Sequence, residues 1–198
     1  MRWRNWAVMA LACGMAAGAA TAANASTFLR VGLDYLVAEN ETIVVGEATS
    51  ARSYWNAAGT FILTDVQVSV SQVLKGSVKS KEITVTVPGG TVGELTSVVV
   101  GGAQLAPGKT YVLFLDRIDL PGSKGVLAVH DHGQGAFDVD LEGNELRAVS
   151  QARRQELLPD AAGKADAVGG AEGMPLARLL AEVRQLAARE RNGRPEVK

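Results

Sequence analysis

The sequence predicts a mainly β domain of five to six antiparallel strands, a barrel or sandwich, with a short helix before it and an amphipathic helix after it. Several short segments between residues 43 and 141 are β-branched or alternate between apolar and polar residues, as strands do. Turn signals such as Pro88-Gly89-Gly90 and Pro107-Gly108-Lys109 separate these segments. No strand is followed by a helix long enough for a βαβ crossover, which disfavours a parallel sheet.

The first 25 residues have the composition of a signal peptide. Arg2 and Arg4 form a basic head, residues 6–20 are apolar and rich in alanine, and Ala23-Asn24-Ala25 fits the small-x-small rule for cleavage. The apolar run is shorter than the roughly 20 residues that a membrane-spanning helix needs. We therefore expect cleavage before Ser26 and a secreted or periplasmic product.

The composition excludes thiol chemistry from the predicted exported product and argues against nucleic-acid binding. Cys13 is the only cysteine and lies inside the predicted signal peptide, so the mature chain has neither a disulfide nor a thiolate site. Acylation of Cys13 is the alternative use of this residue. The net charge is −1 and no basic stripe is present, which argues against nucleic-acid binding.

The N-terminal part of the mature chain predicts a helix and then a buried strand. Leu29, Leu33 and Leu36 recur near helical spacing, so residues 26–40 are expected to form a short helix. Ile43-Val44-Val45-Gly46 is apolar throughout and predicts a strand that is buried on both faces. Residues 48–59 are expected to form a polar loop.

The clearest strand runs from Phe61 to Leu74, because Val66, Val68 and Val70 share one parity and polar residues hold the other. The alternation slips by one residue at Gln72-Val73, which predicts a β-bulge.

Four further strands are expected, and a helical segment closes the chain. The strands cover residues 83–87, 111–115, 125–129 and 137–141. Residues 150–173 are expected to hold a helix from Gln151 to Leu158 and then a flexible linker. Residues 174–192 predict a helix with Pro175 in its first turn. Its apolar stripe consists of Leu176, Leu179, Leu180, Val183, Leu186 and Ala187. The stripe is expected to dock on the β domain, with a partner or a membrane surface as the alternatives.

Familiar catalytic motifs are absent from the sequence. It contains no Gly-x-Ser-x-Gly, no His-Glu-x-x-His, no phosphate loop and no Ser-x-x-Lys. We therefore expect a protein that is not an enzyme and has no cofactor.

His130-Asp131-His132 is the one cluster that suggests a metal. If these residues lie on a strand, His130 and His132 point to the same face, and a hairpin could bring Asp138 or Asp140 opposite them. Two histidines and a carboxylate can ligate zinc. The sequence therefore raises a metal site of His130, His132 and Asp138, against the alternative of two solvated histidines at a hairpin end.

Tyr54-Trp55-Asn56 lies in the predicted polar loop and suggests a contact for a partner. An exposed tryptophan can stack on a sugar ring or insert into a protein interface. The alternative is that Trp55 folds back as a lid on the mouth of the barrel.

From Ile43 to Val139 the chain resembles a family of exported bacterial proteins whose OB-fold domain is similar to tissue inhibitors of metalloproteinases (TIMPs) and netrin-like modules. The resemblance rests on Ile43-Val44-Val45-Gly46-Glu47, Trp55, Thr64 with the Val66/Val68 strand, Val73-Leu74-Lys75-Gly76, Val87-Pro88-Gly89-Gly90, the Gly102 to Pro107-Gly108 stretch, Tyr111-Val112-Leu113-Phe114-Leu115 and Gln134-Gly135-x-Phe137.

This resemblance implies a five-stranded Greek-key OB-like barrel with a flanking helix, here within residues 26–149. It carries over no inhibitory residue, because inhibitors of that class chelate the protease zinc through an N-terminal cysteine that the mature chain lacks. Similar bacterial domains are associated with secreted metalloproteases, so the resemblance implies a secreted or envelope protein, such as a protease, as the partner.

Together these observations predict an exported, non-enzymatic module that binds a protein through its loops. The alternatives are a carbohydrate or cell-envelope binder that uses Trp55, and a metal-dependent hydrolase built on His130 and His132. Membrane association is not expected after cleavage of the signal peptide.

Overall fold

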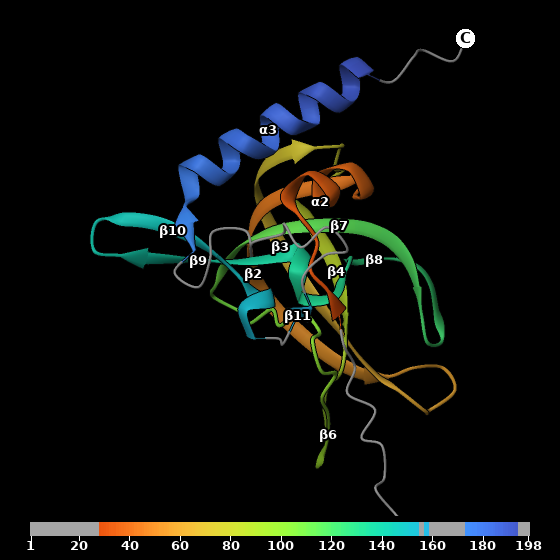
Figure 1. Cartoon of the computed structure of the whole chain (residues 1–198). Coiled ribbons are helices and arrows are strands. Elements are labelled where there is room, and N and C mark those ends of the chain that lie inside the picture. Colours follow the sequence, from red (N-terminus) through yellow and green to blue (C-terminus); the bar gives the residue numbers. More distant parts are fainter. Residues whose placement is uncertain (1–27, 155–156, 159–172, 194–198) are drawn as a thin grey trace, which may run out of the picture.

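An antiparallel sheet of eight strands forms the body of the protein (Figure 1). The computed structural model describes residues 28–154, 157–158 and 173–193. The strands of the main sheet are β2 (Thr42–Trp55), β3 (Ile62–Lys75), β4 (Glu82–Pro88), β7 (Thr110–Leu120), β8 (Ser123–Val129), β9 (Ala136–Glu142), β10 (Glu145–Ser150) and β12 (Met174–Pro175). Their order is β12-β10-β9-β7-β2-β3-β4, and β8 pairs with β7 beside this path.

Smaller elements surround the main sheet. Two short pairs of strands are β1 with β11 and β5 with β6. Two α-helices and two 3₁₀ turns complete the described chain. The bounds of these elements are β1 (Phe28–Leu29), α2 (Leu33–Glu39), β5 (Gly90–Val92), β6 (Leu95–Ser97), η1 (His132–Gly135), η2 (Gln151–Arg154), β11 (Leu157–Leu158) and α3 (Leu176–Gly193).

The central strands β2 and β7 carry apolar side chains on both faces. Val44 and Leu113 face one buried cluster, which the curled sheet encloses. Ile43 and Phe114 face a second cluster, on which α2 and α3 pack. The prediction that residues 43–46 and 111–115 form strands buried on both faces is confirmed. The helices α2 and α3 cover the face of these strands that the curled sheet does not enclose.

The long strand contains a register shift beside the bulge predicted at Gln72-Val73, but it lies one residue earlier, at Ser71. Val70 pairs with Gly46 and Gln72 pairs with Val45, so Ser71 has no partner in the register. The strands approach closely there, since a Cβ on Gly46 would lie 2.6 Å from a methyl group of Val68. Glycine at this position therefore allows the bend.

The predicted loop at residues 48–59 is wrong over most of its length. β2 continues to Trp55 and pairs with β3 throughout, from Ile43 opposite Lys75 to Trp55 opposite Ile62. Residues 49–52 are exposed, so this part of the hairpin carries little of the apolar pattern that reveals a strand. Pairing with a well-patterned neighbour outweighs weak local propensity here.

Two other predictions of local structure need correction, and one strand of the main sheet was missed. Residues 26–40 do not form one helix, because Phe28–Leu29 is a strand paired in parallel with Leu157–Leu158 and α2 begins only at Leu33. The same pairing ends the predicted helix at Gln151–Leu158 after one 3₁₀ turn. β10 was not predicted. The predicted signal peptide (residues 1–25) and most of the predicted linker lie outside the described residues.

The sheet curls strongly but does not close into a barrel. β4 and β8 lie next to each other in space, yet no ladder joins them in the part of the chain that the structure describes. The expected barrel is therefore open along this line, and the main sheet holds eight strands instead of five or six.

The C-terminal helix packs on its own domain, as the apolar stripe predicts. Leu179, Val183 and Ala187 are buried in the second cluster. Lys75 of β3 ties the two helices together, because its Nζ atom lies 2.6 Å from Glu190 Oε2 on α3 and donates to the carbonyl of Val37 at the end of α2. Pro175 was predicted in the first turn of the helix, but it belongs to β12, and α3 begins one residue later, at Leu176.

Truncation of Leu179 to alanine should lower the free energy of unfolding by about 2–5 kcal/mol, because it leaves a cavity in the second cluster. Chemical denaturation of the mature protein measures this loss. Arg184→Ala on the exposed side of the same helix is the control and should change stability by less than about 0.5 kcal/mol. Equal stabilities of the two variants would contradict the packing of α3 described above.

Candidate functional site

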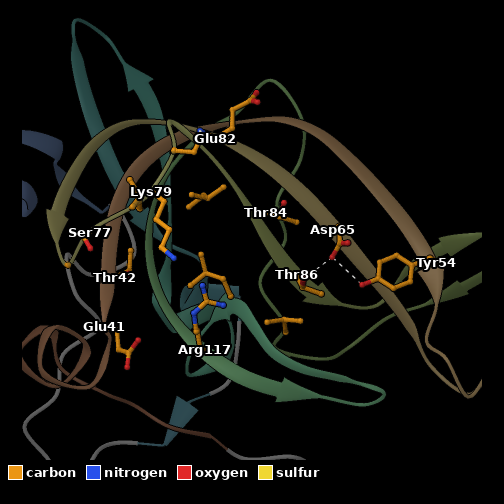
Figure 2. A pocket seen from close by; sticks show the side chains of 16 residues that line it. Glu41, Thr42, Tyr54, Asp65, Ser77, Lys79, Glu82, Thr84, Thr86 and Arg117 are labelled. Atoms are coloured by element: carbon orange, nitrogen blue, oxygen red, sulfur yellow. Dashed lines mark hydrogen bonds between the residues drawn. The ribbon is translucent and has the colours of Figure 1, made fainter.

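A groove of about 680 Å³ runs along the seam between β4 and β8, where the sheet does not close (Figure 2). Polar side chains of β3 and β4 line it, together with the aliphatic Val126 and Leu127 of β8. The connection of residues 76–80 contributes to the end of the groove that lies away from Tyr54. We call this feature the seam groove.

The edge of β4 faces the seam groove with backbone groups that are not used in the ladder to β3. Gly89 donates its N–H to the carbonyl of Ile62 at 2.8 Å, which marks a hydrogen-bonded pair of the two strands. Because such pairs alternate along an antiparallel ladder, the N–H and C=O groups of Thr84 and Thr86 point away from β3. No backbone hydrogen bond within the described residues connects them to β8.

Three side chains from three neighbouring strands meet at one end of the seam groove. The hydroxyl of Thr86 on β4 donates to Asp65 Oδ1 on β3 at 2.7 Å, and the hydroxyl of Tyr54 on β2 donates to the same oxygen at 3.2 Å (Figure 2). Asp65 and Thr86 are direct cross-strand partners. The two hydroxyls hold the carboxylate of Asp65 in one orientation.

Tyr54 remains a hydrogen-bond donor at neutral pH. Partial burial raises the pKa of the Tyr54 phenol above its usual value, and the negative charge and hydrogen bond of Asp65 raise it further. Both effects disfavour the phenolate, because the charged form would lose solvation and would face a carboxylate.

The β7–β8 hairpin forms the opposite wall and is held by its own side chains. Arg117 Nη1 donates to the carbonyl of Gly125 at 3.0 Å, and Asp119 Oδ1 accepts from the N–H of the same glycine at 2.8 Å. These bonds fix the start of β8 relative to β7.

Asn56 joins the β2–β3 hairpin to the β7–β8 hairpin. Its Nδ2 atom donates to the carbonyl of Pro121 at 3.1 Å, and its Oδ1 atom accepts from the N–H groups of Thr60 and Phe61 at 2.9 and 3.2 Å. The side chain is only 5% exposed. We predicted Tyr54, Trp55 and Asn56 as partner contacts, and the structure gives Asn56 the geometry of a turn-bridging residue.

The structure separates Trp55 from the seam groove. Successive residues of a strand point to opposite faces, so Trp55 points away from the face that Tyr54 shares with the groove. Its side chain is 40% exposed. Of the predicted trio, only Tyr54 lines the groove.

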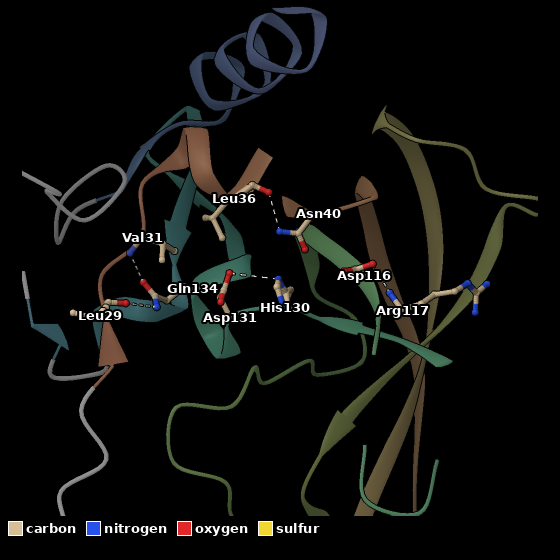
Figure 3. A network of polar contacts seen from close by, with 9 residues as sticks. All are labelled: Leu29, Val31, Leu36, Asn40, Asp116, Arg117, His130, Asp131 and Gln134. Carbon is tan, nitrogen blue, oxygen red and sulfur yellow. Dashed lines mark hydrogen bonds and ion pairs between the residues drawn. The ribbon is translucent and has the colours of Figure 1, made fainter. Parts of the chain in front are cut away.

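The predicted metal ligands do not lie on one strand. β8 ends at Val129, and Asp131 and His132 have positive φ angles of 53° and 59°, so strand alternation does not align the two imidazoles. His130 Nδ1 lies 3.5 Å from Asp131 Oδ2 (Figure 3), and the buried Asp138 accepts a bond of 2.7 Å from Gln151. No group of three His, Cys, Asp or Glu residues in the described ranges could hold a metal ion. Metal binding here stays a prediction from sequence.

The buried side chain of Gln134 gives this region a structural role. Its Oε1 atom accepts from the N–H of Val31 at 3.0 Å and its Nε2 atom donates to the carbonyl of Leu29 at 2.9 Å (Figure 3). These two bonds hold the chain that leads into α2 against the η1 turn.

Asp65, Thr86 and Arg117 were not predicted from the sequence as site residues. Asp65 and Thr86 each occupy a polar position of an alternating strand, which is also the pattern of an ordinary solvated face. Only the register of the sheet shows that the two residues meet Tyr54. The alternation of polar and apolar residues indicates which face of the sheet Asp65 and Thr86 occupy, but it does not indicate which residues of the neighbouring strands they meet.

A search of protein-family models finds no match to this chain, and a search of curated proteins finds no similar sequence. Among the described helices, none is both long and apolar enough to cross a membrane.

Replacing Asn56 with alanine should lower the free energy of unfolding by about 1–3 kcal/mol, because the N–H groups of Thr60 and Phe61 and the carbonyl of Pro121 lose three partly buried hydrogen bonds. Thermal or chemical denaturation measures the change. Asn144→Ala in the exposed β9–β10 turn is the matched control and should be close to neutral. If the two substitutions cost the same, Asn56 does not bridge the hairpins.

Proposed function

We propose that this chain is an exported, non-enzymatic module with an OB-like β domain that binds a protein partner in the seam groove. The unpaired edge of β4 beside a groove with fixed hydrogen-bonding groups carries this proposal. Strand edges and polar side chains of this kind are what proteins use to recognise an extended main chain.

The strand order supports the OB-like part of the proposal. β2, β3 and β4 follow one another through hairpin connections, and β7 returns after a longer connection to lie beside β2. This order agrees with the 4-1-2-3 arrangement of a Greek key and so supports the proposed topology. The additional strand β8 lies between β7 and β4, as expected for a five-stranded, partly open Greek-key barrel.

The location of the groove also favours binding of a macromolecule. An exposed strand edge invites pairing with another chain unless it is covered or blocked. Here β8 approaches the edge of β4 without bonding to it, so the groove above the seam stays accessible. Arg117, Asp119 and Asn56 keep the surrounding hairpins in place, which reduces the entropy lost on binding.

Site-specific photo-crosslinking tests this proposal. A photoreactive phenylalanine replaces the exposed, groove-lining Thr84 in the mature protein, which is then irradiated with the secreted and envelope fractions of its source. We expect a discrete adduct whose peptide mass identifies a protein. The same photoreactive residue at exposed Glu145, on the β9–β10 hairpin, is the control and should give no such adduct. Adducts that are equal at both positions, or absent at position 84, would count against the groove.

A second candidate function, glycan binding, is favoured by the exposed side chain of Trp55. After cleavage before Ser26 this residue is the only tryptophan, so intrinsic fluorescence reports on it alone. If glycans stack on the indole, cell-envelope oligosaccharides should quench or shift the emission, and Tyr54→Phe should leave the response unchanged. Emission that no oligosaccharide alters would exclude this function.

A further inference from the structure

We infer that the carboxylate of Asp65 is the anchor for a lysine or arginine side chain of the protein partner, so that the seam groove recognises an extended segment carrying a positive charge. This inference rests on the proposed function and names the chemistry of the segment that the groove would hold.

The geometry of Asp65 leaves one side of the carboxylate open. Both hydroxyl donors, from Tyr54 and Thr86, bond to Oδ1. The side chain of Asp65 forms no other hydrogen bond or ion pair in the described part of the chain. Its second oxygen, Oδ2, is not one of the buried polar atoms that lack a partner, so it remains accessible. A carboxylate has about four acceptor positions, so Asp65 retains the capacity to accept a charged donor.

Within the described ranges, Asp65 forms no ion pair with a lysine or arginine. Lys79 and Arg117 also line the seam groove, but neither forms an ion pair with Asp65. Arg117 is instead engaged with the carbonyl of Gly125. Glu41 and Glu82 add negative charge to the lining, so the five charged groups sum to −1 and a cationic ligand is favoured.

The remaining surface of the groove suits a long basic side chain attached to a peptide. Val126 and Leu127 offer apolar contact to the methylene stem of lysine or arginine. The N–H and C=O groups of Thr84 and Thr86 that point away from β3 offer partners for the main chain of the segment. Hydrogen bonds between a charged donor and a carboxylate are the stronger kind, and the two hydroxyls hold this carboxylate in place beforehand.

The test is a titration of the isotope-labelled mature protein followed by NMR of its backbone amides. The probes are the tripeptides acetyl-Ala-Lys-Ala-amide and acetyl-Ala-Arg-Ala-amide, the same lysine peptide with an acetylated side chain, and 1,5-diaminopentane. We expect saturable shifts at residues 54, 65 and 86 with the two cationic peptides, and affinity at least about tenfold weaker for the acetylated one.

Variants of Asp65 distinguish the loss of its negative charge from a loss of folding. Asp65→Asn keeps an oxygen for the hydroxyls of Tyr54 and Thr86, so it should fold and lose at least about tenfold in affinity for the cationic peptides. Asp65→Glu keeps the charge in a displaced position and should retain part of the affinity. Asp140→Asn removes an exposed carboxylate of β9 and should bind like the unmodified protein. Added salt should weaken binding to the unmodified protein and not to Asp65→Asn.

Three outcomes would overturn the inference. They are equal affinities for the charged and acetylated peptides, unchanged affinity in Asp65→Asn, and diaminopentane binding as tightly as the peptides, which would assign the site to free amines. If any of these occurs while residue 84 still crosslinks to a protein partner, Asp65 is not the anchor for a basic side chain, and the proposed function stands. If both experiments fail, the proposed function fails as well.

Discussion

The burial of β2 and β7 on both faces is the constraint on which the rest of the structure depends. Each of these strands supplies side chains to two separate apolar clusters, so neither face can be left to water. One face is covered when the sheet curls on itself, and the other is covered by α2 and α3. A chain with a single cysteine cannot form an internal disulfide, so its stability depends on such burial, and two clusters that share the same strands provide it.

The same constraint explains why the site lies where it does. The hairpin of β2 and β3 extends beyond the region that the two clusters cover. There β2 is largely exposed over residues 49–52, whereas Ile62 and Leu63 of β3 are buried. The bulge at Ser71 and the close approach at Gly46 bend this long hairpin. Tyr54 and Asp65 line the seam groove in the part of the hairpin beyond this bend. The groove thus lies on the face of β3 and β4 opposite the core, because Asp65 is followed by the buried Val66, and Thr86 lies between the buried Val85 and Val87.

Sequence patterns predicted those parts of the fold that depend on a single segment. Alternation located β3 and β4, continuous apolar runs located the double-sided strands, and the stripe of α3 showed that the helix has a face to bury. Features that depend on two segments were missed. Phe28–Leu29 and Leu157–Leu158 form a strand pair more than a hundred residues apart in sequence, and neither segment shows a strand pattern by itself. The outer part of β2 is a strand because β3 pairs with it.

The candidate site shows the same division between local and non-local information. Tyr54 was included among the predicted contacts only as the neighbour of Trp55, whereas Asp65 and Thr86 occupy ordinary polar positions of alternating strands. Their importance comes from register, since Tyr54 is 11 residues from Asp65 and Asp65 is 21 residues from Thr86 in the hydrogen bonds that join them. A shift of one residue in either ladder would turn the Asp65 carboxylate toward the apolar cluster. Because Val66 and Val68 hold β3 in its register through the core, the packing that stabilises the fold also positions the carboxylate in the groove.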